Sequence, residues 1–386
     1  MASESTNYQC PSCGGRLHFE AHTNNLACDF CGSRFRPEDV EAYYSRKGGT
    51  ATADGAPSAA EASVDPVHAV ETERVEAGED PIQAYLKRSR WDDKDAESMR
   101  AYNCSSCGAQ LMVDQVTAIK RCPYCGNETI VPGQLADALR PDYLIPFKKT
   151  KEDAIAALKE YYRDKKLLPK SFSDENHLNE IQGVYVPFWL YSTTANTDAN
   201  FSMTQVMTWS DSENIYTKTD HYAAERKGSI DFARVPVDGS TRMPDAHMDS
   251  IEPYDYSEMV PFSLGYLPGF LADRYDQNAE ECKVRAEERM GQSAQDALSH
   301  TVEGYDTVSL DGCSSSVEWN DIRYALLPVW MLHTRWNGQD FLFAMNGQTG
   351  KLIGDLPISW KRLAVRFLAA FVPIAVVAFA VLRFAL

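Results

Sequence analysis

Eight of the ten cysteines form four Cys-x-x-Cys pairs, and this spacing is typical of metal sites. Fourteen residues separate the two pairs of each set. Four thiolates at about 2.3 Å from zinc complete a tetrahedral shell and leave no open position for catalysis. We predict two zinc ions, with iron in a rubredoxin-like role as the less supported alternative. The expected ligands are Cys10, Cys13, Cys28 and Cys31 in the first set, and Cys104, Cys107, Cys122 and Cys125 in the second.

The two sets belong to an internal repeat with a constant offset of 94 residues, in which Tyr8–Gly14 matches Tyr102–Gly108. A glycine follows the second cysteine of every pair, where its tolerance of a left-handed backbone lets amide hydrogens turn toward the sulfur atoms. Such a small unit cannot bury its own core, so bound zinc would supply roughly 10–16 kcal/mol of stability. The sequence leaves open whether each unit is an inert folding staple or also contacts a partner.

Four other candidate ligands are expected to be ordinary residues. His18 and His22 lie inside the first repeat, but its four cysteines already complete a site, so we expect both histidines at the surface. Cys282 is predicted in a polar helix and Cys313 in a loop, and neither has a partner by spacing.

The sequence patterns of the helices and strands that must hold these cysteines predict an α+β protein with a strand-rich body and antiparallel hairpins. Helical periodicity covers residues 82–101, 151–168 and 269–300. Strand patterns cover residues 184–191, 201–209, 214–222, 324–336, 340–345 and 351–353. Asn337-Gly338 predicts a type I′ turn between two of these strands. Residues 229–268 are expected to form an ordered but irregular connection.

These patterns divide the chain into six predicted parts. The stretch between the repeats is rich in Ala, Gly, Ser, Asp and Glu, so it should not fold alone. The parts are a rubredoxin-like zinc ribbon at 1–45, a disordered acidic linker at 46–81, a helix at 82–101, a second zinc ribbon at 102–133, an α+β body at 141–359 and a transmembrane helix at 361–386.

The last part is an apolar run, 363–386, interrupted by Arg366 and Arg383. As a helix it would extend roughly 36 Å, against a hydrocarbon core of about 30 Å. Lys361, Arg362 and Arg366 gather at its N-terminal side, so the positive-inside rule predicts a single-pass membrane protein with its soluble part in the cytoplasm. The polar start of the chain and the paired cysteines also fit a reducing compartment.

The net charge of −17 argues against nucleic acid as a partner, because phosphate backbones repel an anionic surface. A local basic face could override this total. Arg16, Arg34 and Arg36 in the first ribbon, and Lys120 and Arg121 in the second, keep a membrane-tethered nucleic-acid-binding protein as the alternative function.

Several stretches resemble a family of bacterial membrane-anchored zinc-ribbon proteins, the YdjG-like proteins. Members are often labelled TFIIB-type zinc ribbon-containing proteins or mislabelled as the primosomal helicase. The resemblance spans about residues 102–386 and rests on Cys122–Gly126, Leu144–Phe147, Gly183–Tyr191, Pro236–Ser240 and Asn346–Lys351. It implies no enzymatic activity. It implies instead a role in membrane-stress assemblies with PspA-like or SPFH-like proteins.

Enzyme signatures do not fit the chain. Gly347–Lys351 is too short for a phosphate loop and is not followed by Ser or Thr, so we interpret it as a turn. Zincin and serine-hydrolase motifs are missing from the sequence. We therefore expect a non-catalytic, membrane-anchored zinc-binding scaffold or adaptor that contacts the bilayer and protein partners, in an oligomeric state that the sequence leaves unknown.

Overall fold

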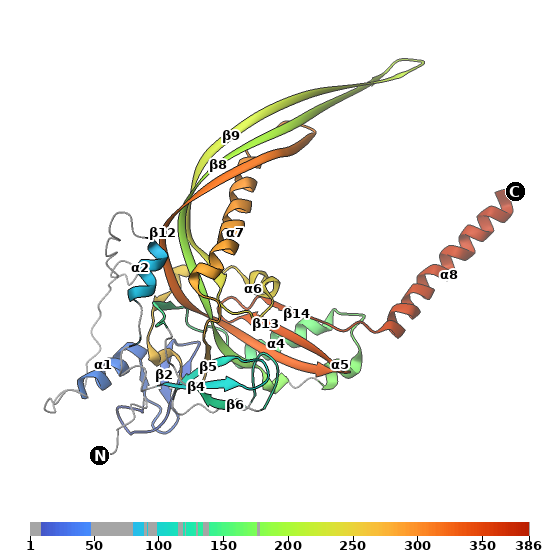
Figure 1. Cartoon of the computed structure of the whole chain (residues 1–386). Helices are drawn as coiled ribbons and strands as arrows, with labels where there is room; N and C mark the ends of the chain where they lie inside the picture. Colours follow the sequence, from blue (N-terminus) through green and yellow to red (C-terminus); the bar gives the residue numbers. More distant parts are fainter. Residues whose placement is uncertain are drawn as a thin grey trace.

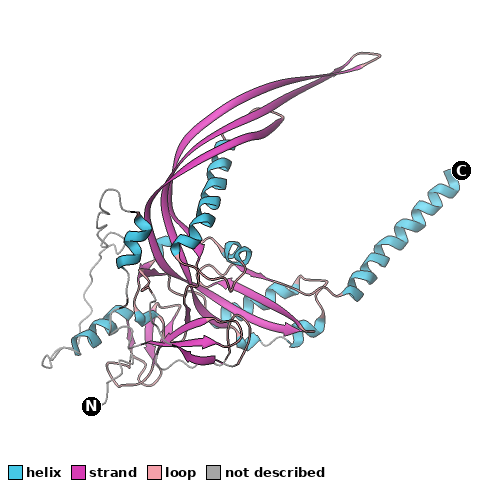
Figure 2. Cartoon of the chain, in the orientation of Figure 1, coloured by secondary structure: helices cyan, strands magenta, loops and turns pink. Residues whose placement is uncertain are grey.

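A computed structural model describes residues 9–47, 80–88, 91, 99–114, 119, 121–128, 130–133, 139–175 and 178–385. It confirms the α+β class (Figure 1; Figure 2). Its helices are α1 (Pro37–Lys47), α2 (Pro81–Arg88), α4 (Lys151–Arg163), α5 (Lys170–Glu175), α6 (Asp245–Ile251), α7 (Ala279–Ser299) and α8 (Trp360–Ala385). Its strands are β1 (Leu17–Glu20), β2 (Asn25–Cys28), β3 (Arg34–Phe35), β4 (Met99–Cys104), β5 (Gln110–Asp114), β6 (Ile130–Gly133), β7 (Tyr143–Leu144), β8 (Gln182–Ser210), β9 (Ile215–Asp238), β10 (Val260–Pro261), β11 (Leu271–Asp273), β12 (Thr307–Trp336), β13 (Gln339–Asn346) and β14 (Leu352–Gly354).

One mixed sheet organises the body. Among the described residues it runs β10-β7-β12-β8-β11-β5-β4-β6, with β9 paired to β8, β13 to β12 and β14 to β13. Successive side chains of β8 point to opposite faces, so Val184 and Val186 enter one core while Tyr185 and Trp189 enter the other. The stretch Gly183–Tyr191 is therefore buried on both sides, and its residues are largely apolar.

The second ribbon is part of this sheet. Its strand β5 pairs antiparallel with β11, which in turn runs parallel to β8. The sequence predicts the ribbon at 102–133 as a module separate from the body at 141–359, and those boundaries stay predictions. The strand pairing nevertheless makes this ribbon continuous with the core of the body.

Beyond the body, β8, β9 and β12 continue as a long curved arm with α7 along its concave side (Figure 1). Side chains that face α7 are buried in alternation, among them Ala199, Phe201 and Met203. Beyond Thr307, where β12 begins, the arm narrows to the β8–β9 hairpin, where Trp209 stacks on Tyr216 with ring centroids 5.6 Å apart.

The arm corrects three expectations. The strands predicted at 201–209, 214–222 and 324–336 are each too short, and the first quarter of the predicted irregular segment 229–268, residues 229–238, belongs to β9. Cys313 lies in β12 and not in a loop. The physical reason is exposure: β9 and the first half of β12 face water along most of their length, so they lack the clear apolar alternation that β8 keeps where it faces α7.

Three helices also differ in length from the prediction. Of the helix expected at 82–101 the described residues include α2, residues 89–90 and 92–98 lie outside the described part, and Met99 already starts β4. The helix expected at 151–168 ends at Arg163. The one expected at 269–300 begins at Ala279, because Asn278 caps it with bonds to two backbone amides and the preceding Leu271–Asp273 form β11. Most of the predicted linker, 46–81, lies outside the described residues.

The predicted hairpin turn is confirmed, with φ of 50° at Asn337 and 78° at Gly338. The turn predicted at 347–351 is also present. The side-chain Oδ1 of Asn346 accepts hydrogen bonds from the amides of Gln348 and Thr349, each at 2.9 Å. The backbone amides of the turn thus form hydrogen bonds within the turn, as expected of a tight connection between β13 and β14.

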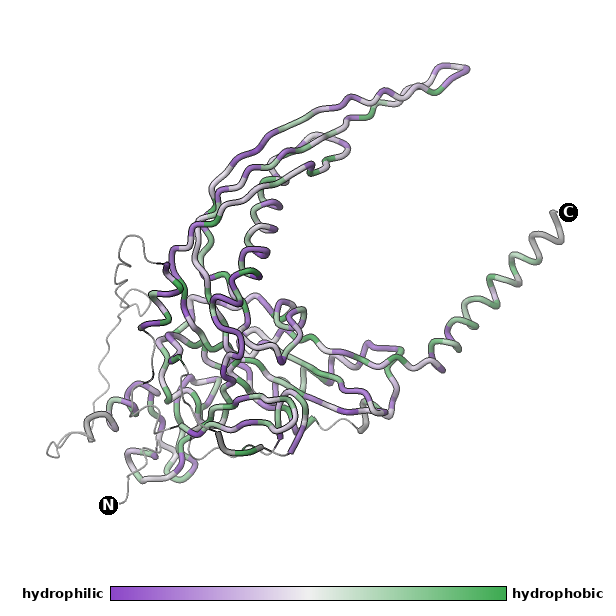
Figure 3. The backbone as a smooth tube through the Cα atoms, viewed as in Figure 1, coloured by the Kyte–Doolittle hydropathy of each residue, from purple (hydrophilic) through white to green (hydrophobic). Residues whose placement is uncertain are grey.

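Helix α8 projects away from the body and is mostly hydrophobic (Figure 3). Residues 360–379 are long and apolar enough to cross a membrane, and none of that stretch is buried against the rest of the chain.

Candidate metal centres

The structure brings each predicted set of four cysteines together. In both sets the four Sγ atoms lie within 4.8 Å of one another. The closest pairs are 3.5 Å apart in the first ribbon and 3.6 Å apart in the second. Four sulfurs at about 2.3 Å from a central ion would be separated by about 3.8 Å, so both clusters fit a tetrahedral thiolate-bound metal such as zinc.

The same backbone turn presents the sulfurs at all four Cys-x-x-Cys pairs. In each, the glycine after the second cysteine donates its amide to the carbonyl of the first cysteine at 2.8–2.9 Å. The four glycines, Gly14, Gly32, Gly108 and Gly126, have φ between 68° and 74°. This left-handed conformation is the one expected from the sequence, and it is unfavourable for residues with a Cβ.

Without metal the thiols of one cluster cannot all ionise together. A hydrogen bond from Cys122 lowers the pKa of Cys107 to about 5, and the same contact raises the pKa of Cys122. In the first cluster, the hydroxyl of Ser33 lowers the pKa of Cys31 to about 6. A divalent ion removes this mutual repulsion, because it stabilises all four thiolates at once.

A buried polar contact fixes the second ribbon to the body. Tyr124 lies between the ligands Cys122 and Cys125, and its hydroxyl donates to the carboxylate of Asp273 at 2.5 Å. Ser240 donates to the same oxygen at 2.9 Å. Burial raises the pKa of Asp273 to about 6. The second ribbon is thus held by the turn between Cys122 and Cys125 as well as by strand pairing.

The first ribbon contacts the body through Phe19, in strand β1 of its hairpin. The ring of Phe19 packs on Tyr266 and Phe270, with centroids 5.4 and 6.2 Å apart. The hydroxyl of Tyr266 also bonds to Glu38 in α1. In its cysteine cluster, Cys13 and Cys31 are exposed, and Phe30, the equivalent of Tyr124 in the repeat, is 78% exposed.

The remaining candidates lie outside both clusters. His18 and His22 contact Asp29 and Asp153 at 3.2 and 3.7 Å; His18 is partly exposed and His22 is exposed. Cys282 is buried, and burial raises its pKa to about 12.

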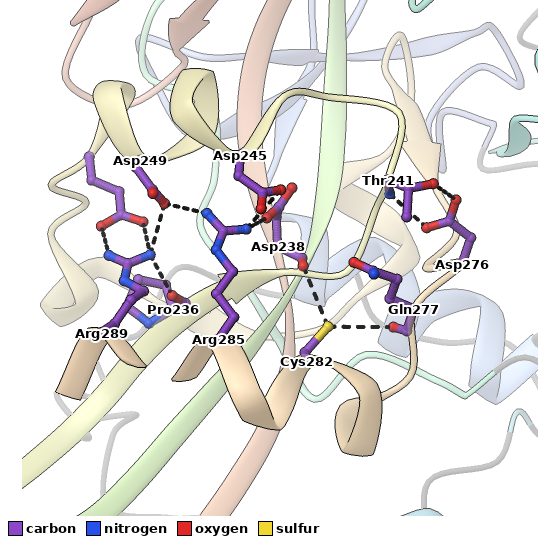
Figure 4. A network of polar contacts seen from close by, with 11 residues as sticks. Pro236, Asp238, Thr241, Asp245, Asp249, Asp276, Gln277, Cys282, Arg285 and Arg289 are labelled. Carbon is purple, nitrogen blue, oxygen red and sulfur yellow. Dashed lines mark hydrogen bonds and ion pairs between the residues drawn. The ribbon is translucent and has the colours of Figure 1, made fainter. Parts of the chain in front are cut away.

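Sequence reasoning missed a second polar network, at the base of α7 (Figure 4). Arg285 pairs with the buried Asp238 at 2.6 Å and with Asp249 at 2.8 Å, and Arg289 binds Glu252 at 2.7 Å. Burial raises the pKa of Asp238 to about 7. Asp238 and Ser240 lie in the segment Pro236–Ser240 that supports the family resemblance, and this was the available signal. The network joins α7, α6 and the end of β9.

Fold and site together define an α+β protein with two four-cysteine groups suited to zinc. The chain is similar over nearly its whole length to a protein named "Uncharacterized protein YdjG" from Bacillus subtilis (strain 168). The two are 29% identical over 360 residues, which cover 93% of this chain and 92% of that protein. No family model matches the chain, and no solved structure matches it. The comparison supports the YdjG-like resemblance, and the relative's name does not mention zinc.

Proposed function

We propose that this protein is a non-catalytic, membrane-anchored, zinc-binding scaffold whose first ribbon recruits a protein partner. The observation that carries the proposal is the contrast between Phe30 and Tyr124. At equivalent positions of the repeat, Tyr124 is 6% exposed and bonded to the body, whereas Phe30 is 78% exposed. An exposed aromatic side chain on a rigid zinc knuckle is a typical contact residue of protein interfaces.

The two ribbons would therefore have different roles. The second stabilises the body, and the first presents its knuckle to a partner. A closed four-thiolate shell supports the non-catalytic role, because it offers no coordination position to a substrate. The apolar helix α8 supports anchorage in a membrane.

The family resemblance suggests which proteins to test as partners, namely PspA-like or SPFH-like proteins of membrane-stress assemblies. A nucleic-acid partner has less support, because Arg34, Arg36 and Arg121 each form an ion pair with an acidic side chain. Arg34 contacts Glu20 and Arg36 contacts Asp39, each at 2.9 Å, and Arg121 contacts Glu128 and Glu180. These ion pairs reduce the positive charge that a phosphate backbone would require.

Affinity purification of the full chain from native membranes in mild detergent tests the proposal. Phe30→Ser should abolish capture of the specific partner while the protein keeps two zinc ions. Val284→Ser is the matched control, because Val284 is an exposed apolar residue of α7, 62% accessible and remote from the ribbons in sequence. Unchanged capture by the Phe30→Ser protein would refute the role of the first ribbon.

A further inference from the structure

Basic side chains gather where the body meets the apolar helix, although the chain as a whole carries −17. The segment Lys159–Lys170 holds five basic and two acidic residues, and Lys361–Arg366 adds three basic residues. Over these two segments the count is eight against two, a net charge of +6. We call the eight side chains the basic patch: Lys159, Arg163, Lys165, Lys166, Lys170, Lys361, Arg362 and Arg366.

Direct contacts hold the two halves of the basic patch together. The amide of Ser359, just before α8, donates to the carbonyl of Leu167 at 2.9 Å. The guanidinium of Arg362, in the first turn of α8, donates to the carbonyl of Leu168. The turn after α4 is therefore fixed beside the start of α8, and Figure 1 shows α5 near the same point.

The side chains surround an open cavity and face solvent. Six of the eight basic side chains line it, together with the single acidic residue Glu160 and with Tyr162, Leu168 and Leu178; the six are Lys159, Arg163, Lys165, Lys166, Lys170 and Arg362. The five basic residues of the segment Lys159–Lys170 are exposed. Arg163 pairs with Glu160, and the ammonium of Lys165 lies 4.4 Å from the ring centroid of Tyr161.

Helix-end electrostatics explains only part of this arrangement. Cations near the C-terminus of α4 complement its dipole, an effect confined to the last turn. Lys166 and Lys170 lie beyond that turn, and Lys361 and Arg366 belong to another helix. Six basic side chains around one cavity are instead the arrangement that binds a phosphate group.

We propose that the basic patch binds the phosphate headgroups of anionic phospholipids where α8 enters the membrane. This inference rests on the proposed anchorage by α8. It goes further, because it names the lipid class and the residues that select it. A lipid headgroup and a free phosphate would both present a negatively charged phosphate to the basic patch. The position of the patch at the base of an apolar helix favours a lipid as the source of that phosphate.

Binding of soluble short-chain lipids to the full chain in a neutral detergent tests the proposal. The probes are dioctanoyl phosphatidylglycerol, dioctanoyl phosphatidylcholine and inorganic phosphate. We expect the first to bind most tightly, with an affinity that falls as salt rises. At roughly five-fold for each lysine near an anionic surface, Lys165→Gln with Lys166→Gln should weaken it about 25-fold. Lys218→Gln with Lys227→Gln, two exposed lysines of the arm, should change it less than two-fold.

The remaining outcomes separate this proposal from the proposed anchorage. Equal affinity for the two lipids, or no effect of the Lys165 and Lys166 changes, would overturn the lipid site. Inorganic phosphate binding as tightly as phosphatidylglycerol would assign the patch to a free anion and overturn the lipid source. Alkaline carbonate extraction of native membranes reports anchorage alone, so a chain that washes off would refute the role of α8 independently of the lipid titration.

Discussion

Truncation of the two equivalent knuckle aromatics should affect stability very differently. Tyr124→Ala removes a ring that is 6% exposed, together with a donor to the buried Asp273. Truncating a buried aromatic costs about 3–5 kcal/mol. Phe30→Ala removes a ring that is 78% exposed, and a surface change of this kind stays within about 0.5 kcal/mol.

A third variant separates the hydroxyl from the ring. Tyr124→Phe keeps the packing but leaves the carboxylate of Asp273 with the single donor Ser240 on that oxygen. Loss of a hydrogen bond to a charged acceptor costs about 1.5–3 kcal/mol, so this variant should lie between the wild type and Tyr124→Ala. It also keeps the comparison informative if Tyr124→Ala does not fold.

Urea unfolding of the zinc-loaded full chain, followed by circular dichroism, measures these changes in the free energy of unfolding. Zinc release to a chromogenic chelator, recorded in the same titration, shows whether a ribbon opens before the body. Equal shifts for Phe30→Ala and Tyr124→Ala would refute the reasoning, because they would mean that both knuckles are held equally by the body.

Three further predictions concern the metal, a turn and the response to pH. Cys104→Ser should lower the melting temperature of the body more than Cys10→Ser, because β5 of the second ribbon belongs to the main sheet. Differential scanning calorimetry with metal analysis would check this, and equal decreases in melting temperature would contradict it. Gly347→Ala should lower the free energy of unfolding, measured by chemical denaturation, by about 1–3 kcal/mol, because a Cβ there would lie 2.6 Å from the Phe147 ring. Gly312→Ala is the control and should lower it far less, because a Cβ at Gly312 would meet nothing within 4 Å. Similar decreases for the two variants would count against this packing. Burial raises the pKa of Asp238 from 3.8 to about 7, so between these pH values the folded state binds one more proton than the unfolded state. The stability that this group contributes is therefore present at low pH and is lost as the pH rises through about 7. Melting curves of zinc-saturated protein from pH 5.5 to 8 should therefore show a shallower decline for Asp238→Asn than for the wild type, and parallel curves would argue against this assignment.

The candidate metal centres could be predicted from sequence because their signal is local. Each cysteine pair and its glycine occupy five consecutive residues, and the chemistry of thiolates fixes what they can hold. The Asn337-Gly338 turn was predictable for the same reason, since both residues tolerate positive φ.

The contacts that give the ribbons different roles are not local. Tyr124 and Asp273 are 149 positions apart, and the sequence does not indicate that they meet. Nor could Phe30 and Tyr124 be distinguished, because both are aromatic residues at the same place in the repeat. Only tertiary packing decides that one is buried and the other exposed.

The sequence predicted short strands in the arm but missed its full length, because most of the arm's strand surface faces solvent. From Asp198 to Ser202 the outward positions of β8 are polar, and β9 is exposed along most of its length. Period-two alternation is clear only where one face is buried. Strand pairing therefore defines the arm beyond the small cluster in which Phe201 and Met203 are buried with Leu298.

The order in which the arm can assemble follows from its pairing. Strands β8 and β9 are joined by a short turn, with Ser210 opposite Ile215, so their hairpin can form early from local contacts. The other edge of β8 must wait for β12, whose Thr307 and Met331 pair with Thr204 and Gln182 more than a hundred residues earlier. Closing so long a loop is slow, and until it closes β8 offers an unpaired edge to other chains. We expect Asp198, Asn200 and Ser202, which obscure this strand in the sequence, to keep the half-formed sheet from aggregating while the rest of the protein folds.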